Sequence, residues 1–184
     1  MSMRVDLEMW KGFSNLLKRK EIKEFSQLLI EGQIAQEAFI IEKGCLRCYS
    51  NSDQDITFQF LFENELFFSI ESFLNNKPNS FSLESIEPCI IHSISKNNFN
   101  KIIRSSKTLQ KQIDNLTFET MIYYENLLSL RSIAEPESRY VRLMTTDPQI
   151  IHRIPNYYVA SYLGIDPSSL IEIMIKMDLP KNLN

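Results

Sequence analysis

The sequence predicts an α+β protein in which a β-rich N-terminal half is followed by one long helix and a smaller group of helices. Three observations support this fold class. Between about residues 18 and 95, short apolar or alternating runs are separated by turn residues, as in an all-β sandwich or barrel. From about residue 96 the apolar spacing becomes helical. Near residues 134–137, Glu135-Pro136-Glu137 interrupts the helical pattern and predicts a hinge.

The first half begins with apolar residues at helical spacing over 5–17, which predict a short N-terminal helix. Strands are then expected in the runs KEIKEF, SQLLI, AFIIE, CLRCYS, ITFQFLF, FSLESI and CIIHSIS. Gly32 and Gly44 fall in two of the intervening turns, where a positive φ carries no steric cost for glycine. The segment 64–81 breaks the strand rhythm and predicts a short helix and loop between strands.

The helical half begins at Ser95, which can cap the run KNNFNKIIRSS, and a longer helix is expected over 107–133. Its apolar positions recur at alternating spacings of four and three, which is typical of a coiled-coil seam. We expect this seam to hold two subunits together through Leu109, Ile113, Leu116, Tyr123, Leu127 and Leu130, with Thr120 in the same row. A second apolar set lies beside it, so one face could cover the β half while the other meets a partner. The alternative is a single core helix.

The C-terminal segment predicts two short helices joined by a tight turn. Pro155 suits the first turn of a helix that ends at Gly164, where a left-handed residue is favoured. Asp166 can cap a second helix that begins at Pro167 and runs to residue 177. This spacing is typical of a helix-turn-helix, and the alternative is a packed helix pair with no role on DNA.

Composition excludes several classes of protein. The net charge of −3 means that any affinity for nucleic acid must come from a local surface. No apolar run is long enough for a membrane span and no signal peptide is recognisable, so we expect a cytoplasmic protein with no membrane partner. Three cysteines and two histidines offer no metal cluster, and nucleotide-binding loops and nucleophile elbows are missing. We therefore expect no catalytic residues, no metal and no enzyme activity.

The order of these parts resembles the Crp/Fnr transcription regulators, and most closely their short, divergent members from Bacteroidetes. The resemblance is carried by IEGQIAQEAFIIEKGCLRCYS (30–50), the segment 65–96, ESRYVRLM (137–144) and IPNYYVASYLGIDPSSL (154–170). It implies a jelly roll of the cyclic-nucleotide-binding type over 1–133, including a dimerisation helix at 107–133. It further implies a DNA-binding helix-turn-helix domain over 137–184, with a truncated or missing wing. The implied partners are DNA, a second copy of the chain and RNA polymerase.

The sequence departs from this family where cyclic AMP would bind. Cyclic-AMP-responsive members carry a Gly-Glu-Leu turn and, about nine residues later, an Arg-Ser pair that binds the cyclic phosphate. The corresponding residues here, together with two from the long helix, form the candidate ligand pocket: Ser69, Ile70, Glu71, Ser80, Phe81, Thr120 and Tyr123. No arginine lies between residues 48 and 103, and an anionic ligand would meet Glu71 and Glu84. We expect no cofactor and no response to cyclic AMP through the usual cassette.

The second of the C-terminal helices also departs from the family, because it carries Glu172 and several isoleucines where basic residues would read DNA. The candidate contacts to bases are Ser168, Ser169, Glu172 and Lys176, and those to phosphates are Arg139, Arg142, Asn156 and Tyr157. Residues 137–184 contain five cationic and five anionic side chains and thus no net positive charge, so DNA binding should be weak and sensitive to salt. The alternative is a degenerate member that acts as a protein-interaction or ligand-binding module without reading DNA.

Overall fold

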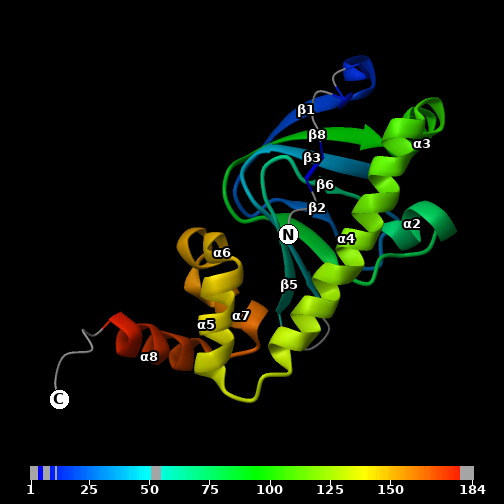
Figure 1. Cartoon of the computed structure of the whole chain (residues 1–184). Helices are drawn as coiled ribbons and strands as arrows, with labels where there is room; N and C mark the ends of the chain where they lie inside the picture. Colours follow the sequence, from blue (N-terminus) through cyan, green and yellow to red (C-terminus); the bar gives the residue numbers. More distant parts are fainter. Residues whose placement is uncertain (1–3, 6–8, 11, 51–54, 179–184) are drawn as a thin grey trace.

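The computed structural model describes residues 4–5, 9–10, 12–50 and 55–178. A roll of strands occupies one end, the long helix α4 lies along its side, and four shorter helices gather where α4 ends (Figure 1). Helix α8 points away from the roll at this end. The predicted α+β fold class is therefore confirmed.

The roll consists of two four-stranded antiparallel sheets, as the predicted sandwich requires. Each sheet combines strands from distant parts of the chain. In the first sheet, for example, the first strand of the chain pairs with the last. The first sheet has the order β1 (Lys18–Ile22), β8 (Cys89–Ser95), β3 (Glu37–Lys43), β6 (Leu66–Phe67). The second has the order β2 (Gln27–Leu29), β7 (Ser82–Ser85), β4 (Leu46–Ser50), β5 (Ile56–Leu61).

The turn between β3 and β4 requires glycine at position 44. Gly44 has φ +105°, and a Cβ there would lie 2.5 Å from the sulfur of Cys89 and 2.9 Å from its Cα. Any side chain would therefore combine an unfavourable backbone conformation with a collision. The amide of Gly44 donates to Glu63 Oε1 at 2.8 Å, which ties this turn to the turn that follows β5.

Four helical elements flank the roll, and serine side chains cap three of them, as the sequence predicts for Ser95. The elements are η1 (Ser14–Leu16), α2 (Ile70–Asn75), α3 (Lys96–Ser105) and α4 (Lys107–Arg131). Ser69, Ser95 and Ser106 each accept an N–H from the residue three positions later, which satisfies a helix donor that would otherwise lack a partner. Within the helix predicted over 5–17, the described residues Met9 and Trp10 are helical and η1 follows at Ser14–Leu16, while residues 6–8 and 11 lie outside the described part.

The C-terminal helices are α5 (Pro136–Thr146), α6 (Pro148–Arg153), α7 (Asn156–Leu163) and α8 (Pro167–Asp178). The two predicted helices around Gly164 are confirmed, because Gly164 ends α7 with φ +64°. Asp166 caps α8 by accepting the amide of Ser168 at 2.9 Å. No strand occurs over 136–178, and residues 179–184, where a wing would continue, lie outside the described chain. Within the described residues, no helix has both the length and the apolar character needed to cross a membrane.

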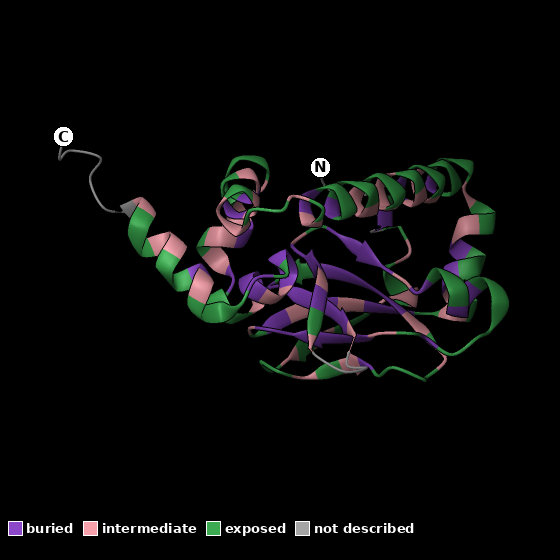
Figure 2. Cartoon of the chain, turned by 90° about the horizontal axis from the view of Figure 1, so that it is seen from below, coloured by how far each residue is buried: buried purple, intermediate pink, exposed green. Residues whose placement is uncertain are grey.

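The burial of the residues predicted for the dimer seam contradicts that prediction. Leu109, Leu116, Leu127 and Leu130 are each exposed by 6% or less, and they pack into the chain's own cores. Ile113 and Tyr123 are partly buried against the same cores. The seam therefore fixes α4 to its own roll. The opposite side of α4 faces outward (Figure 2).

A second hydrophobic core joins the roll to the C-terminal helices. It contains Cys45 and Phe60 from the roll and Tyr162 and Leu163 from α7, among others. The rings of Phe60 and Tyr162 lie 5.4 Å apart. Cys48, three residues after Cys45, is buried in the other core, as expected for residues on opposite faces of a strand. The shared core holds α7 directly against strand β5.

Candidate effector pocket and nucleic-acid interface

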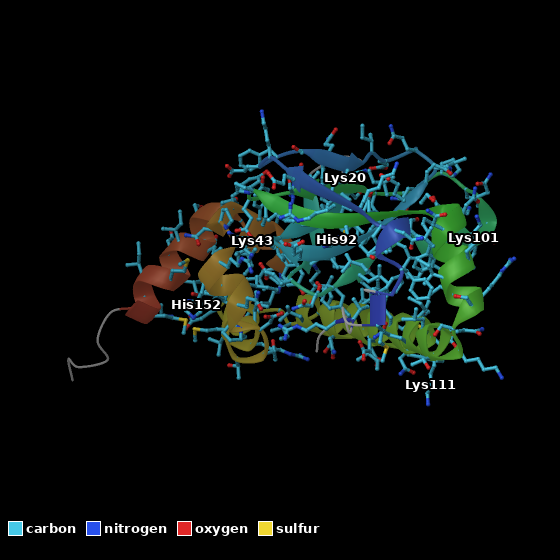
Figure 3. The ribbon with its side chains drawn as sticks, turned by 90° about the horizontal axis from the view of Figure 1, so that it is seen from above. Lys20, Lys43, His92, Lys101, Lys111 and His152 are labelled. Atoms are coloured by element: carbon cyan, nitrogen blue, oxygen red, sulfur yellow. The ribbon has the colours of Figure 1, made fainter. Side chains whose placement is uncertain are left out.

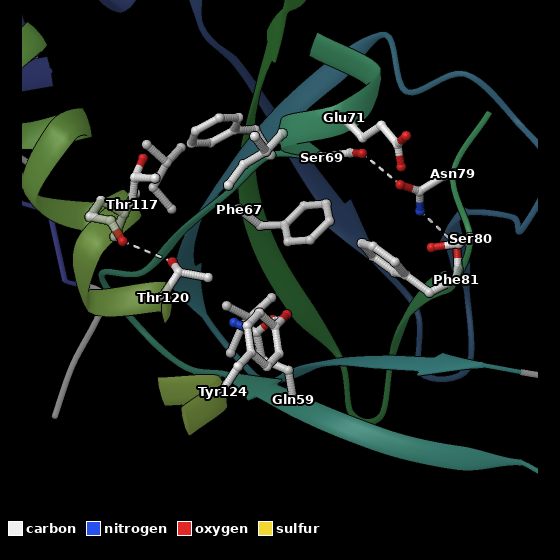
Figure 4. Close-up of a pocket in the computed structure, with 15 residues that line it drawn as sticks. Gln59, Phe67, Ser69, Glu71, Asn79, Ser80, Phe81, Thr117, Thr120 and Tyr124 are labelled. Carbon is white, nitrogen blue, oxygen red and sulfur yellow. Dashed lines mark hydrogen bonds between the residues drawn. The ribbon is translucent and has the colours of Figure 1, made fainter. Parts of the chain in front are cut away.

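A cavity of about 180 Å³ lies between strands β5 and β6, helix α2, the segment 79–81 and helix α4 (Figure 4). Its lining combines aromatic and aliphatic side chains with hydroxyl and amide groups. The lining residues are Gln59, Leu61, Leu66, Phe67, Phe68, Ser69, Ile70, Glu71, Asn79, Ser80, Phe81, Leu116, Thr117, Thr120 and Tyr124. The cavity occupies the place that the sequence comparison with cyclic-AMP-responsive proteins predicts for an effector.

Six of the seven residues predicted for the pocket line this cavity: Ser69, Ile70, Glu71, Ser80, Phe81 and Thr120. Tyr123 does not line it, and its neighbour Tyr124 does. Consecutive residues of an α-helix point about 100° apart, and here Tyr124 is the one that is turned towards the cavity. The hydroxyl of Tyr123 instead donates towards the carbonyl of Phe58 at 3.2 Å and lies 3.1 Å from the hydroxyl of Tyr162 in α7.

Most polar groups of the cavity are held by other groups of the chain. Ser69 Oγ donates to Asn79 Oδ1 at 2.5 Å, and Asn79 Nδ2 donates to the carbonyl of Phe81 at 2.7 Å. Tyr124 donates to Gln59 Oε1 at 2.9 Å, and Thr120 donates to the carbonyl four residues earlier. These bonds fix the shape of the cavity before any ligand enters.

Among the described residues that line the cavity, Glu71 alone carries a formal charge. Its carboxylate is half exposed and lies 3.6 Å from Lys77 Nζ, which is itself exposed. A cyclic phosphate requires a guanidinium or a set of backbone amides to replace its hydration. The lining offers a carboxylate where such a ligand would need a cation.

Arg47, which is not among the predicted site residues, is buried on strand β4 and is 2% exposed. It donates to Glu84 Oε1 at 2.6 and 2.9 Å and to Asp55, and its guanidinium lies 4.1 Å from the ring centroids of Tyr49 and of Tyr158 in α7. The expectation that Glu84 would face a ligand is therefore wrong, because Arg47 binds it. Burial lowers the pKa of Arg47, but its bonds to Asp55 and Glu84 outweigh burial and raise the pKa overall.

A second arginine, which is half-buried, fixes α7 to strand β5. Arg131, the last residue of α4, donates to the carbonyls of Thr57 at 2.6 Å, Tyr162 at 3.0 Å and Ser161 at 3.3 Å. Beside it, Ser161 Oγ donates to the carbonyl of Asp55 and accepts the amide of Thr57 at 2.8 Å. The edge of the roll therefore uses its free backbone groups to bind α7.

The cavity and α7 share two structural elements. On α4, Tyr124 lines the cavity while Tyr123 contacts Tyr162 of α7. On β5, Gln59 lines the cavity while Thr57 binds Ser161 of α7. A ligand that displaces α4 or β5 would therefore act directly on the contacts that position α7 and α8.

Helix α6 is bound to the roll through a bidentate ion pair. Arg153 donates to both carboxylate oxygens of Glu63, at 2.6 and 2.7 Å, and also to Glu87. The hydrogen bonds from Arg153 lower the pKa of Glu63 to about 2, despite an opposing contribution from burial. Because the pKa of Glu63 is lower in the folded state, the pair stabilises the fold above about pH 4.5 and this contribution disappears as the pH falls towards 2.

We expect Arg153→Met to lower the free energy of unfolding at pH 7 by about 1–2 kcal/mol, since a partly exposed bidentate pair is lost. The difference from the unmodified protein should shrink between pH 5 and pH 2, as Glu63 becomes protonated. Urea unfolding at pH 7, 5 and 3 measures this difference. Arg142→Met serves as the control, because Arg142 makes one bond of 3.2 Å to Ser129. A difference that persists at low pH would contradict the assignment.

The outward face of α8 is exposed, and it carries two large apolar side chains among polar ones. Ser168, Ile171, Glu172, Ile175 and Lys176 are all exposed, with Ile171 at 49% and Ile175 at 59%. Two of the polar side chains are already bound within the chain. Lys176 Nζ lies 2.6 Å from Glu137 Oε2 of α5, and Ser168 Oγ donates to Asp166 at 2.6 Å. Ser169 is half-buried.

The residues predicted to contact phosphates differ in their surroundings. Arg139 donates to the carbonyls of Ile133, Leu163 and Gly164, so its guanidinium caps the end of α7 and the expected phosphate contact is not supported. Asn156 and Tyr157 are exposed at the start of α7, and Arg142 is partly exposed on α5.

The basic side chains labelled in Figure 3 are spread over the molecule, and His152 alone of those labelled lies among the C-terminal helices.

Comparison with known proteins agrees with this architecture. Residues 19–106 match the family model of the cyclic nucleotide-binding domain. No curated protein gives a sequence match to the chain. The fold is therefore that of a cyclic nucleotide-binding domain followed by a long helix and a helical C-terminal part.

Solved structures of bacterial regulators share this whole arrangement at low sequence identity. A CooA mutant from Carboxydothermus hydrogenoformans matches with a TM-score of 0.77 and 13% identity, over 100% of this chain and 91% of that one. The c-di-GMP responsive regulator CLP from Xanthomonas campestris matches with a TM-score of 0.75 and 12% identity, over 94% and 91%. A protein described as a Crp/Fnr family regulator from Eubacterium rectale matches with a TM-score of 0.74 and 15% identity, over 98% and 88%. The chain has the fold of the Crp/Fnr-type regulators.

Proposed function

We propose that this protein is a dimeric, DNA-binding transcription regulator of the Crp/Fnr type that does not respond to cyclic AMP through the usual phosphate cassette. The observation that carries the proposal is the arrangement of α7 and α8. Gly164 ends α7 and Asp166 caps α8, a spacing that is typical of a helix-turn-helix, and the outer face of α8 is exposed at the end of the molecule.

In this proposal residues 1–133 form the sensor and residues 137–184 bind DNA. Helix α8 enters the major groove with Ser168, Glu172 and Lys176 towards the bases, and the partly buried Ser169 at its edge. Glu172 can accept a hydrogen bond from a cytosine amino group, although nearby phosphates repel it. Lys176 must leave Glu137 to reach DNA. Arg142, Asn156 and Tyr157 contact phosphates, and this small number of cations makes binding weak and sensitive to salt.

Dimerisation in this proposal uses the outward face of α4. Phe118, Met121, Ile122 and Leu128 recur at helical spacing on this face and are exposed by 39–72%. A stripe of this kind is costly to leave in water over a helix of 25 residues. A second copy of the chain, with its α4 antiparallel or parallel to this stripe, would cover it and double the DNA-binding helices.

The cavity supports the remaining parts of the proposal. A cytoplasmic effector other than cyclic AMP would enter it, and the contacts of Tyr123 and Thr57 would transmit its presence to α7. No cofactor is needed, and no catalytic role is proposed. RNA polymerase would be the further partner of the DNA-bound dimer.

A second candidate function is favoured by the apolar surface of α8. Ile171 and Ile175 are exposed beside Glu172, a combination that fits a protein partner better than the phosphate backbone. In that case the chain is a degenerate regulator that acts as an interaction module without reading DNA.

Selection of genomic DNA fragments at low salt distinguishes the two functions. We expect the unmodified protein to enrich a palindromic site, and Leu128→Glu to lose this enrichment because it places charges in the dimer face. Leu74→Glu is the matched control, since Leu74 is equally exposed on α2 and far from that face in sequence. Enrichment by Glu172→Arg alone would contradict the first function and favour the interaction module. Sedimentation of the same variants reports their dimerisation.

A further inference from the structure

We propose that the cavity beside α4 binds a small, uncharged, single-ring aromatic molecule that carries a hydrogen-bond donor, of the phenol class. The inference rests on the proposed sensor role of this cavity and specifies its ligand. Three properties of the cavity support it: its volume, the rings in its wall and the charge at its mouth.

The volume matches a ligand of about one ring. The cavity measures about 180 Å³. A protein cavity of about 150 Å³ holds one benzene molecule. One ring with one polar substituent therefore fits the available space. A cyclic nucleotide, with two fused rings, a ribose and a phosphate, would require the wall to move apart.

The wall offers edges and faces of aromatic rings. Phe67 and Phe81 are perpendicular at 83°, with centroids 6.1 Å apart, and Phe58 meets Phe81 from behind at 5.3 Å. Tyr124 approaches from α4, so that Phe67, Phe81 and Tyr124 surround the same space (Figure 4). A further ring in this space gains offset or edge-to-face contacts in addition to the burial of its apolar surface.

The polar groups select against anions and favour a donor. Glu71 is the one formally charged group among the described lining residues, and it offers carboxylate oxygens as acceptors. Asn79 and Ser69 are already bonded to each other, so they hold the wall and are less available to a ligand. A phenol hydroxyl can donate to an acceptor on this side of the cavity, whereas a carboxylate or phosphate would meet the charge of Glu71 without a cation from the lining.

Isothermal titration of the full-length protein at pH 7 with phenol, benzoate, toluene and cyclic AMP tests the inference. Phenol should bind measurably at submillimolar to millimolar concentration. Toluene, which has the same ring without a donor, should bind about 5- to 10-fold more weakly, as expected for one lost hydrogen bond. Benzoate should bind at least about 10-fold more weakly than phenol, because it carries the same ring but is an anion at pH 7. Cyclic AMP should bind more weakly than phenol or not at all.

Thr120→Leu adds bulk to the wall and should abolish phenol binding. Its matched control is Thr145→Leu on α5, because each threonine donates to the carbonyl four residues earlier at 2.8 Å but Thr145 is far from the cavity. Circular dichroism verifies that the variants fold. If Thr120→Leu does not fold, Glu71→Gln provides the test, because Glu71 is half exposed and its replacement leaves the core intact. This substitution should bring the affinities for benzoate and phenol closer together.

The outcomes separate this inference from the proposed function. Phenol binding that Thr120→Leu leaves unchanged, or cyclic AMP binding tighter than phenol, would overturn the inference. The absence of binding by any aromatic probe would overturn it as well, while selection of a palindromic DNA site would still uphold the regulator. Conversely, phenol binding without any selected DNA site would uphold the ligand class and reject the DNA-binding role.

Discussion

Replacing Arg47 by methionine should lower the free energy of unfolding by about 3–5 kcal/mol, the range typical of removing one partner of a buried ion pair. The guanidinium is 2% exposed, and it binds Glu84, Asp55 and the hydroxyl of Thr57. Methionine would occupy part of the space but would leave the carboxylate of Glu84, which is only 11% exposed, without its cation. This decrease in the free energy of unfolding should exceed the decrease that follows from removing any exposed ion pair on the roll.

The effect of Arg47 should extend to the C-terminal helices, because its guanidinium also stacks on Tyr158 of α7. Chemical denaturation measures the loss, and hydrogen exchange of α7 amides reports the second effect. In the double variant Arg47→Met with Glu84→Leu, much of the loss should be recovered, since the buried carboxylate of Glu84 is gone and only the partly exposed Asp55 lacks its cation. Arg19→Met is the surface control, because Arg19 pairs with Glu21 and Glu42 on an exposed strand and should change little. Equal losses for Arg19 and Arg47 would refute this account.

Arg131→Met should lower the free energy of unfolding by about 2–3 kcal/mol and release α7 from the edge of the roll. Three carbonyls, from Thr57, Ser161 and Tyr162, would lose a charged donor. The gain from no longer burying a guanidinium limits the loss, since burial is also what lowers the pKa of Arg131. This residue joins the end of α4, strand β5 and helix α7, so its removal should uncouple the sensor from the proposed DNA-binding helices.

Limited proteolysis at the 132–135 turn measures this uncoupling, and cleavage should accelerate in Arg131→Met. Arg131→Lys keeps the charge, but its single ammonium group cannot replace the guanidinium that reaches three carbonyls. Its cleavage rate should therefore lie between those of Arg131→Met and the unmodified protein. Arg142→Met, with one exposed bond to Ser129, should be cleaved like the unmodified protein. Unchanged cleavage of Arg131→Met would show that the shared core alone holds α7 in place.

Local sequence predicted the elements and their ends well. Ser95 caps α3, Gly164 ends α7 with a positive φ and Asp166 caps α8, as residue type and spacing indicated. These features depend on bonds within about four residues, which is why they can be read along the chain. Alternating runs also predicted the two-sheet roll, because a half-buried strand must repeat its apolar residues every second position.

The choice between the two faces of α4 could not be made from the sequence. Both faces carry apolar residues at helical spacing, and the heptad row suggested the wrong one for a partner. The two hydrophobic cores of the chain bury Leu109, Leu116 and Leu127 and leave Phe118 and Leu128 outside. The same selection explains why Tyr124 faces the cavity and Tyr123 faces α7.

The sequence alone predicted most strands and helices and several of their caps, although neither β6 nor α6, and it showed that no arginine lies in the segment that would hold a cyclic phosphate. The tertiary structure decided which charges meet. Arg47 reaches Glu84 across 37 residues, Arg153 reaches Glu63 across 90, and Lys176 reaches Glu137 across 39. Local bonds fix the backbone of each element, but a charge finds its partner only when packing brings distant elements together, and no spacing along the chain encodes that meeting.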